Sequence, residues 1–159
     1  MFYLGFSYVG LIIVAVVLLP NLLFVIFPPK NIPNRLQDVN LLFTIIERMG
    51  IIAFIVILLT SNVSFINLNF NLFLLLMILC IVIYYVLWLR YVLKGQDFSL
   101  LFTPLLFIPI PMAIFPVCYF LFASFWINSI YLTITTLIFA IGHFANSWNS
   151  YLHIKSFKY

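Results

Sequence analysis

Residues 49–89 read MGIIAFIVILLTSNVSFINLNFNLFLLLMILCIVIYYVLWL and contain no Asp, Glu, Lys or Arg. Charged residues are also missing from residues 1–29 and from residues 98–154. A helix that crosses the hydrocarbon core of a bilayer needs about 20 predominantly apolar residues. The three charge-free stretches hold five segments of that length, so the sequence predicts an all-α, polytopic membrane helix bundle with five transmembrane helices.

The spacing of apolar and polar residues places these helices along the chain. We expect them at about residues 4–27, 41–60, 72–92, 100–123 and 130–151, within one transmembrane domain that covers residues 1–159. The first apolar segment lacks a preceding basic region and a following small-residue cleavage site, so we interpret it as a retained helix and not as a signal peptide.

Prolines interrupt two of the expected helices. Pro20, followed by Asn21, is expected to break the first helix. The fourth expected helix contains four prolines: Pro104, Pro109, Pro111 and Pro116. Within a helix, each proline would free the carbonyl group four residues earlier. A rigid kink and a moving hinge are both open interpretations.

Composition excludes several classes of protein. The chain is 67% hydrophobic and 6% charged, and its mean hydropathy is +1.29. Five helices of roughly 22 residues occupy most of these 159 residues and leave no length among them for a nucleotide-binding or separate catalytic domain. The seven basic residues form no stripe, so we expect no nucleic-acid partner. Neither Cys80 nor Cys118 lies in a metal-binding spacing, and we expect no metal and no cofactor.

Basic residues alternate between the expected loops. They follow the first, third and fifth helices and are absent after the second and fourth, and they are Lys30, Arg35, Arg90, Lys94, Lys155 and Lys158. Cytoplasmic loops carry an excess of Lys and Arg. The pattern therefore predicts an N-terminus outside and a cytoplasmic C-terminus.

Polar residues within the expected helices are candidates for a binding site, because lipid offers them no hydrogen bonds. Eight such residues are candidate ligand-binding residues: Asn21, Glu47, Arg48, Tyr84, Tyr85, Thr103, His143 and Asn146. At about 1.5 Å per residue, all fall roughly 5–15 Å inside the expected cytoplasmic boundary. The sequence thus predicts one polar site that opens towards the cytoplasm.

Two alternatives remain open for these residues. Glu47 and Arg48 either lie inside the membrane or mark its interface, where arginine extends its side chain towards the headgroups. His143 and Asn146 share one helix face, and they either fix helix packing through hydrogen bonds or form a binding or proton-relay site with Glu47. Gly142 would let a neighbouring helix approach closely.

Four short motifs occur in order along the chain. They are residues 19–21 (LPN), 46–50 (IERMG), 84–91 (YYVLWLRY) and 139–143 (FAIGH). As a set they resemble a family of small, uncharacterised integral membrane proteins of Gram-positive bacteria. The resemblance implies five helices and a plasma-membrane location, and it carries no activity that would assign a catalytic residue.

Three functions are compatible with these features. The first is binding or transport of a small molecule or lipid through the polar site, with membrane lipids and a small-molecule ligand as partners. The second is a non-catalytic accessory or assembly subunit, with a homo-oligomer or a membrane partner protein. The third and least favoured is an intramembrane enzyme that modifies a lipid, because no nucleophile, metal or cofactor motif accompanies His143 and Glu47.

Overall fold

The computed structural model describes residues 5–33, 40–61 and 70–156 of the chain. This part of the chain forms α1 (Tyr8–Ile26), α2 (Leu41–Thr60), α3 (Leu72–Leu93), the 3₁₀ helix η1 (Phe98–Leu101), α4 (Pro111–Trp126) and α5 (Ile130–Ser156). By length and composition α1, α2, α3 and α5 can each cross a membrane, whereas α4 has only 16 residues. The prediction of an all-α fold is confirmed, and the four long apolar helices are those of a multi-pass membrane protein. The fifth expected span is not among these four.

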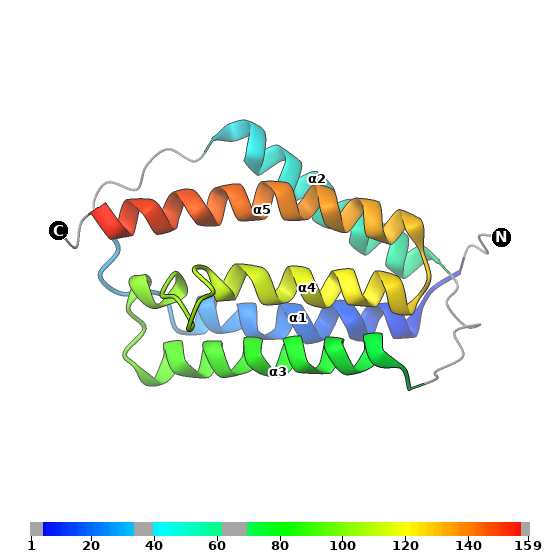
Figure 1. Ribbon diagram of the computed structural model, residues 1–159, viewed down its shortest axis with the longest axis horizontal. Coiled ribbons are helices and arrows are strands. Elements are labelled where there is room, and N and C mark those ends of the chain that lie inside the picture. Colours follow the sequence, from blue (N-terminus) through cyan, green and yellow to red (C-terminus); the bar gives the residue numbers. More distant parts are fainter. Residues whose placement is uncertain (1–4, 34–39, 62–69, 157–159) are drawn as a thin grey trace.

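The five α-helices pack side by side as a bundle (Figure 1). α4 lies between α5 on one side and α3 on the other, α2 packs along α5, and α1 contacts α2 and α3. α1, α3 and α5 end where α2 and α4 begin. Lys30, Arg90, Lys94 and Lys155 therefore gather at this end of the bundle, which we call the basic end. Arg35 and Lys158 lie outside the described residues.

Two glycines bring α2 and α5 into backbone contact. A Cβ atom added at Gly142 would lie 2.5 Å from the backbone oxygen of Phe43 and 2.5 Å from the backbone nitrogen of Glu47. One added at Gly50 would overlap the backbone nitrogen of Phe139. Small residues allow such approaches between membrane helices. Because the backbones of α2 and α5 are this close, side chains of the two helices near the crossing lie within contact distance of each other.

α1 continues through Pro20, so the expected break at Pro20 and Asn21 is wrong. Pro20 removes the N–H donor for the carbonyl group of Val16. The hydroxyl group of Tyr85 on α3 donates a hydrogen bond to that carbonyl oxygen at 2.9 Å. An exposed backbone oxygen in a membrane must find such a donor, and the neighbouring helix supplies it.

The helix expected over residues 100–123 is also wrong in its first half, because α4 begins only at Pro111. Pro104 and Pro109 precede the helix, Pro111 lies in its first turn and Pro116 alone lies inside it. A residue that precedes proline is biased away from the α conformation. Three such positions within eight residues keep residues 102–110 out of a regular helix.

Residues 102–110 instead form a compact irregular segment whose backbone is held by hydrogen bonds. Leu105 and Ile108 exchange two backbone hydrogen bonds of 2.9 Å. The Nη2 atom of Arg90 on α3 donates to the carbonyl oxygens of Leu100 at 3.2 Å and Thr103 at 3.3 Å. Irregular backbone is tolerated beside membrane helices only where its polar groups are satisfied by protein or water. Arg90 therefore stabilises the irregular path of the chain into α4.

A turn of three residues, 127–129, joins α4 to α5. Asn128 adopts a left-handed conformation with φ of 56°, which asparagine tolerates better than most residues. The hydroxyl groups of Ser124 on α4 and Thr133 on α5 lie 2.9 Å apart and join the two helices beside this turn. α4 and α5 are consequently fixed as an antiparallel pair.

Candidate functional site

A carboxylate on α2 contacts two polar residues on α5. The Oε1 atom of Glu47 lies 2.6 Å from the Nδ1 atom of His143. The Nδ2 atom of Asn146 donates a hydrogen bond of 2.5 Å to Oε2 of the same carboxylate. This arrangement depends on the close approach at Gly142, which places the backbone of Glu47 directly against α5. Both oxygens of Glu47 are therefore occupied within the protein.

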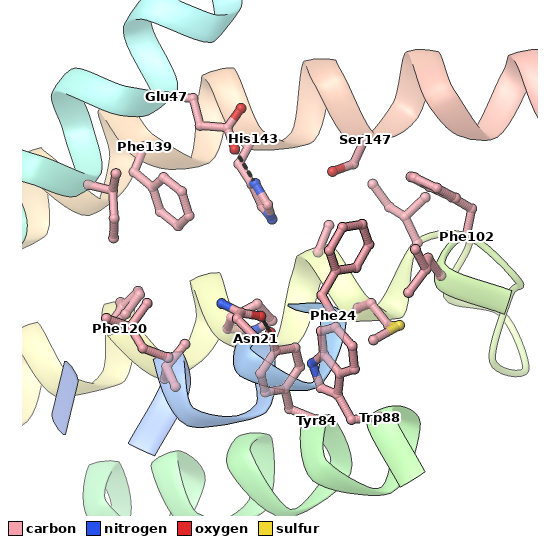
Figure 2. Close-up of a pocket in the computed structure, with 18 residues that line it drawn as sticks. Asn21, Phe24, Glu47, Tyr84, Trp88, Phe102, Phe120, Phe139, His143 and Ser147 are labelled. Atoms are coloured by element: carbon pink, nitrogen blue, oxygen red, sulfur yellow. Dashed lines mark hydrogen bonds and ion pairs between the residues drawn. The ribbon is translucent and has the colours of Figure 1, made fainter. Parts of the chain in front are cut away.

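The contact with Glu47 fixes the role of each imidazole nitrogen. A carboxylate only accepts hydrogen bonds, so we assign a proton to the Nδ1 atom of His143, which then donates a hydrogen bond to Glu47. The Nε2 atom is then the ring atom left for another partner. In Figure 2 the ring extends from α5 towards Asn21 on α1. Phe139 stacks on the imidazole with ring centroids 4.9 Å apart, which holds the ring in this orientation.

A second polar pair lies opposite His143 (Figure 2). The hydroxyl group of Tyr84 on α3 donates a hydrogen bond of 2.7 Å to Oδ1 of Asn21 on α1. Trp88, one helical turn after Tyr84, packs edge-on against it with ring centroids 6.3 Å apart. Trp88 is only 5% exposed. Its indole Nε1 has no hydrogen-bond partner among the residues that the structure describes.

A cavity of about 380 Å³ separates the two polar pairs. Glu47, His143, Asn21, Tyr84 and Trp88 contribute to its walls, and most of its remaining lining is apolar. Those apolar residues include the following aromatic and aliphatic side chains: Val17, Leu18, Phe24, Ile51, Leu101, Phe102, Ile110, Met112, Phe120 and Phe139. The site is thus a largely apolar chamber with hydrogen-bonding groups on facing walls.

The mouth of the cavity runs along α1. Leu18, Asn21 and Phe24 are the exposed residues of its lining, and they are spaced by three along one helix. At the far end of the bundle α1 packs tightly on α2, where a Cβ atom added at Gly10 would lie 2.5 Å from the backbone oxygen of Leu58. α2 diverges from α1 towards the basic end (Figure 1), and the cavity lies on this wider side.

Four of the predicted site residues do not line the cavity. Arg48 is exposed on α2. Tyr85 binds the Val16 carbonyl and thereby serves the packing of α1 on α3. The Thr103 hydroxyl donates to the Ser99 carbonyl at 2.8 Å and lines a separate pocket at the basic end. Asn146 contacts Glu47 from outside the cavity wall.

The sequence interpretation missed Trp88 and Phe139, which the structure places in the cavity wall. Trp88 follows Tyr84 by four residues and Phe139 precedes His143 by four, so each shares a helix face with a candidate polar residue. That spacing is a signal that was available in the sequence. The described residues contain no group of three or more His, Cys, Asp or Glu side chains that could hold a metal ion. The cavity offers hydrogen bonding, a paired carboxylate and an apolar surface.

Comparisons of the chain with protein-family models, with curated proteins and with solved structures find no match.

Proposed function

We propose that this protein binds a small molecule or lipid in the cavity between α1 and α5, in the plasma membrane of a Gram-positive bacterium. The basic end faces the cytoplasm in this proposal, because Lys and Arg are enriched in cytoplasmic loops. The N-terminus then lies outside and the C-terminus inside. The family that the sequence resembles is consistent with this location.

The cavity is the observation that carries the proposal. Its volume of about 380 Å³ falls in the range of small-molecule sites, which are concave and mostly apolar with a few placed polar groups. The buried N–H group of Trp88 is near the hydroxyl group of Tyr84 but makes no well-formed hydrogen bond within the described residues, and a buried donor left without one costs about 1–3 kcal/mol. A ligand with a hydrogen-bond acceptor at this position would remove that cost.

Binding accounts for the site better than catalysis. Both carboxylate oxygens of Glu47 already accept hydrogen bonds from α5. A general base must reach the proton that it abstracts from a substrate, and of the Glu47 and His143 side chains only Nε2 of His143 is free of the contact between them. We therefore assign Glu47 the role of orienting His143, and His143 the role of a hydrogen-bonding group for the ligand.

Native mass spectrometry of the protein released from mild detergent tests this function. We expect the wild-type protein to carry a discrete adduct of one small molecule or one lipid species. The adduct should be lost in Glu47→Gln, where His143 is no longer held by a carboxylate. Arg48→Gln is the matched control, because Arg48 neighbours Glu47 but does not line the cavity.

The masses of the wild-type protein and the two variants decide whether the cavity binds a ligand. An adduct retained by Arg48→Gln and lost from Glu47→Gln supports the proposal. A bare wild-type mass, or bulk lipid bound equally by all three proteins, overturns it. Circular dichroism and size-exclusion chromatography of each variant establish that a lost adduct does not reflect a lost fold.

A second function, that of an accessory subunit, is favoured by Arg48. Its side chain is exposed on α2 and makes no ion pair within the described residues. A charged side chain on the outer face of a membrane helix is costly, and an acidic group on a partner helix would compensate it. In this case gentle crosslinking in native cells captures a partner that Arg48→Gln loses and Glu47→Gln retains. Recovery of no partner and no homo-oligomer contradicts this function.

A further inference from the structure

A second pocket, of about 370 Å³, lies at the basic end of the bundle. Ser99 and Thr103, from η1 and the irregular segment, form one side of it. Tyr151 and Lys155, from the last turns of α5, form the other side. The pocket is therefore built at the end of the bundle, where the chain departs from regular helix.

The charges around this pocket favour an anion. Lys155 lines it, and no Asp or Glu of the described residues does. Arg90 lies behind it and binds the backbone of Thr103. Neither Lys155 nor Arg90 forms an ion pair in the part of the chain that the structure describes, and Nε of Arg90 is buried without an acceptor there. The nearby carboxylate of Asp97 is engaged by the backbone N–H of Ser99 at 2.8 Å and by the side chain of Asn31 at 2.9 Å. Among the described residues that line the pocket, Lys155 therefore carries the positive charge.

The donors of the pocket suit a phosphate group in particular. The Lys155 ammonium group can donate up to three hydrogen bonds, and the hydroxyl groups of Ser99 and Tyr151 can each donate one. Hydrogen bonds from a cation to phosphate oxygens are shorter and stronger than those between neutral groups. A phosphate on a lipid headgroup and a free phosphate ion share this chemistry.

The second pocket adjoins the apolar cavity. This neighbour favours a lipid headgroup over a free phosphate ion, because only a lipid has an apolar part to place there. Phe102 lines both spaces. Along α5, His143 and Ser147 line the cavity, and Tyr151 and Lys155 line the second pocket, each four residues after the last. At 1.5 Å per residue the run from His143 to Lys155 covers about 18 Å. A polar strip on α5 therefore leads from the second pocket to an apolar chamber.

We infer that the two spaces together bind one anionic amphiphile, with its phosphate headgroup against Lys155, Ser99 and Tyr151 and its apolar chain passing Phe102 into the cavity. The inference rests on the proposed binding function and names the class of ligand. The mouth along α1 admits the chain from the side of the bundle, from the bilayer itself. A free phosphate ion would leave the apolar chamber unused.

Titration of the purified protein in neutral detergent with three probes tests the inference. The probes are dioctanoyl phosphatidic acid, dioctanoylglycerol, which lacks the phosphate, and inorganic phosphate, and binding is measured by isothermal calorimetry. We expect phosphatidic acid to bind at least about tenfold more tightly than either other probe, since one hydrogen bond to a charged group contributes about 1.5–3 kcal/mol.

Single substitutions test which residues bind the headgroup and which border the passage to the cavity. Lys155→Gln should weaken the binding of phosphatidic acid by about tenfold and leave that of dioctanoylglycerol unchanged. Lys94→Gln is the matched control, because Lys94 is exposed at the same end and lines neither space. Phe102→Trp should weaken the binding of both lipids by narrowing the passage, and it should not affect inorganic phosphate.

Each other outcome contradicts the inference in a different way. Inorganic phosphate that binds as tightly as phosphatidic acid and competes with it shows a free-phosphate site. Equal binding of the two lipids, lost in Glu47→Gln, overturns the headgroup site and leaves the proposed function standing. Absence of binding by both lipids overturns the inference, and the proposed function falls with it only if the wild-type protein also shows no adduct by native mass spectrometry.

Discussion

The hydroxyl group of Tyr85 lies 2.9 Å from the carbonyl oxygen of Val16, which Pro20 leaves without its helical donor. Two other α3 side chains also bind α1 and its C-terminal end, since Tyr84 donates to Asn21 and Tyr91 donates to the Phe27 carbonyl at 2.9 Å. Three tyrosines of one helix therefore hold its neighbour along most of its second half. α1 forms the mouth of the cavity, so these bonds also determine the shape of the opening.

We expect Tyr85→Phe to lower the free energy of unfolding by about 0.5–1.5 kcal/mol, the usual contribution of one hydrogen bond. The same change in a Pro20→Ala background should cost less, because the backbone N–H restored at position 20 would then donate to the Val16 carbonyl. Unfolding in mixed micelles, followed by circular dichroism, measures the four proteins of this cycle. Equal costs in the two backgrounds would show that the hydroxyl does not compensate for the proline.

Gly142→Ala should separate α2 from α5. The added Cβ would lie 2.5 Å from backbone atoms of Phe43 and Glu47, and overpacking of this kind costs about 1–3 kcal/mol. Ile141→Ala is the control, because Ile141 is 58% exposed on the same helix and its truncation creates no internal cavity. If the two variants unfold at the same denaturant concentration, the backbone contact at Gly142 does not determine the stability of the α2–α5 packing.

Arg90→Leu should loosen the irregular segment before α4. The carbonyl group of Thr103 loses its side-chain donor, whereas that of Leu100 keeps a backbone hydrogen bond of 3.5 Å from Thr103. A buried polar group left unpaired costs about 1–3 kcal/mol. Hydrogen–deuterium exchange across residues 98–110 should rise by at least about tenfold, while exchange within α2 stays unchanged. Lys94→Leu serves as the control for removal of a positive charge at the basic end. Equal exchange in all three proteins would refute a structural role for Arg90.

The neutral imidazole of His143 should carry its proton on Nδ1, because that atom faces the carboxylate of Glu47 at 2.6 Å. Nitrogen-15 spectra of histidine-labelled protein distinguish the two tautomers. The chain has two histidines, so His153→Gln leaves the signal of His143 alone. Glu47→Gln should reduce the population of the Nδ1–H tautomer, because the glutamine amide can donate as well as accept a hydrogen bond. A dominant Nε2–H tautomer in the wild-type protein would contradict the assigned hydrogen bond.

The sequence predicts α2 and α3 closely because both are determined by local signals. The helices expected over residues 41–60 and 72–92 are observed as Leu41–Thr60 and Leu72–Leu93. Each begins after an asparagine, Asn40 or Asn71, whose side chain accepts a hydrogen bond from the first turn. Side-chain caps and unbroken apolar runs can be recognised from the sequence alone.

The irregular segment and the role of Tyr85 could not be predicted in the same way. Hydropathy does not distinguish an apolar helix from an apolar loop, and residues 100–110 are apolar in either conformation. Whether Pro20 breaks α1 depends on a donor 65 residues later in the chain, at Tyr85. Only the packing of α3 on α1 places that donor, so the outcome is decided by tertiary structure.

The candidate site was predictable as a set of residues but not as a set of contacts. Glu47 and His143 were both identified from their polarity within apolar helices, and Gly142 indicated a close helix approach. Which polar groups meet depends on how far each residue lies along its helix from the place where α2 and α5 cross. Trp88 contributes a buried N–H group, and only the tertiary structure shows that this group makes no well-formed hydrogen bond within the described residues.

The three-residue turn after α4 has a consequence for biosynthesis. Three residues reach only about 10 Å when fully extended, which is far short of the roughly 30 Å thickness of the hydrocarbon core. The end of α4 and the start of α5 therefore lie on the same side of any membrane that both helices cross. α4, with 16 residues, is too short to be a strong stop-transfer sequence alone, and we expect the insertion machinery to release it only with α5, as one helical hairpin.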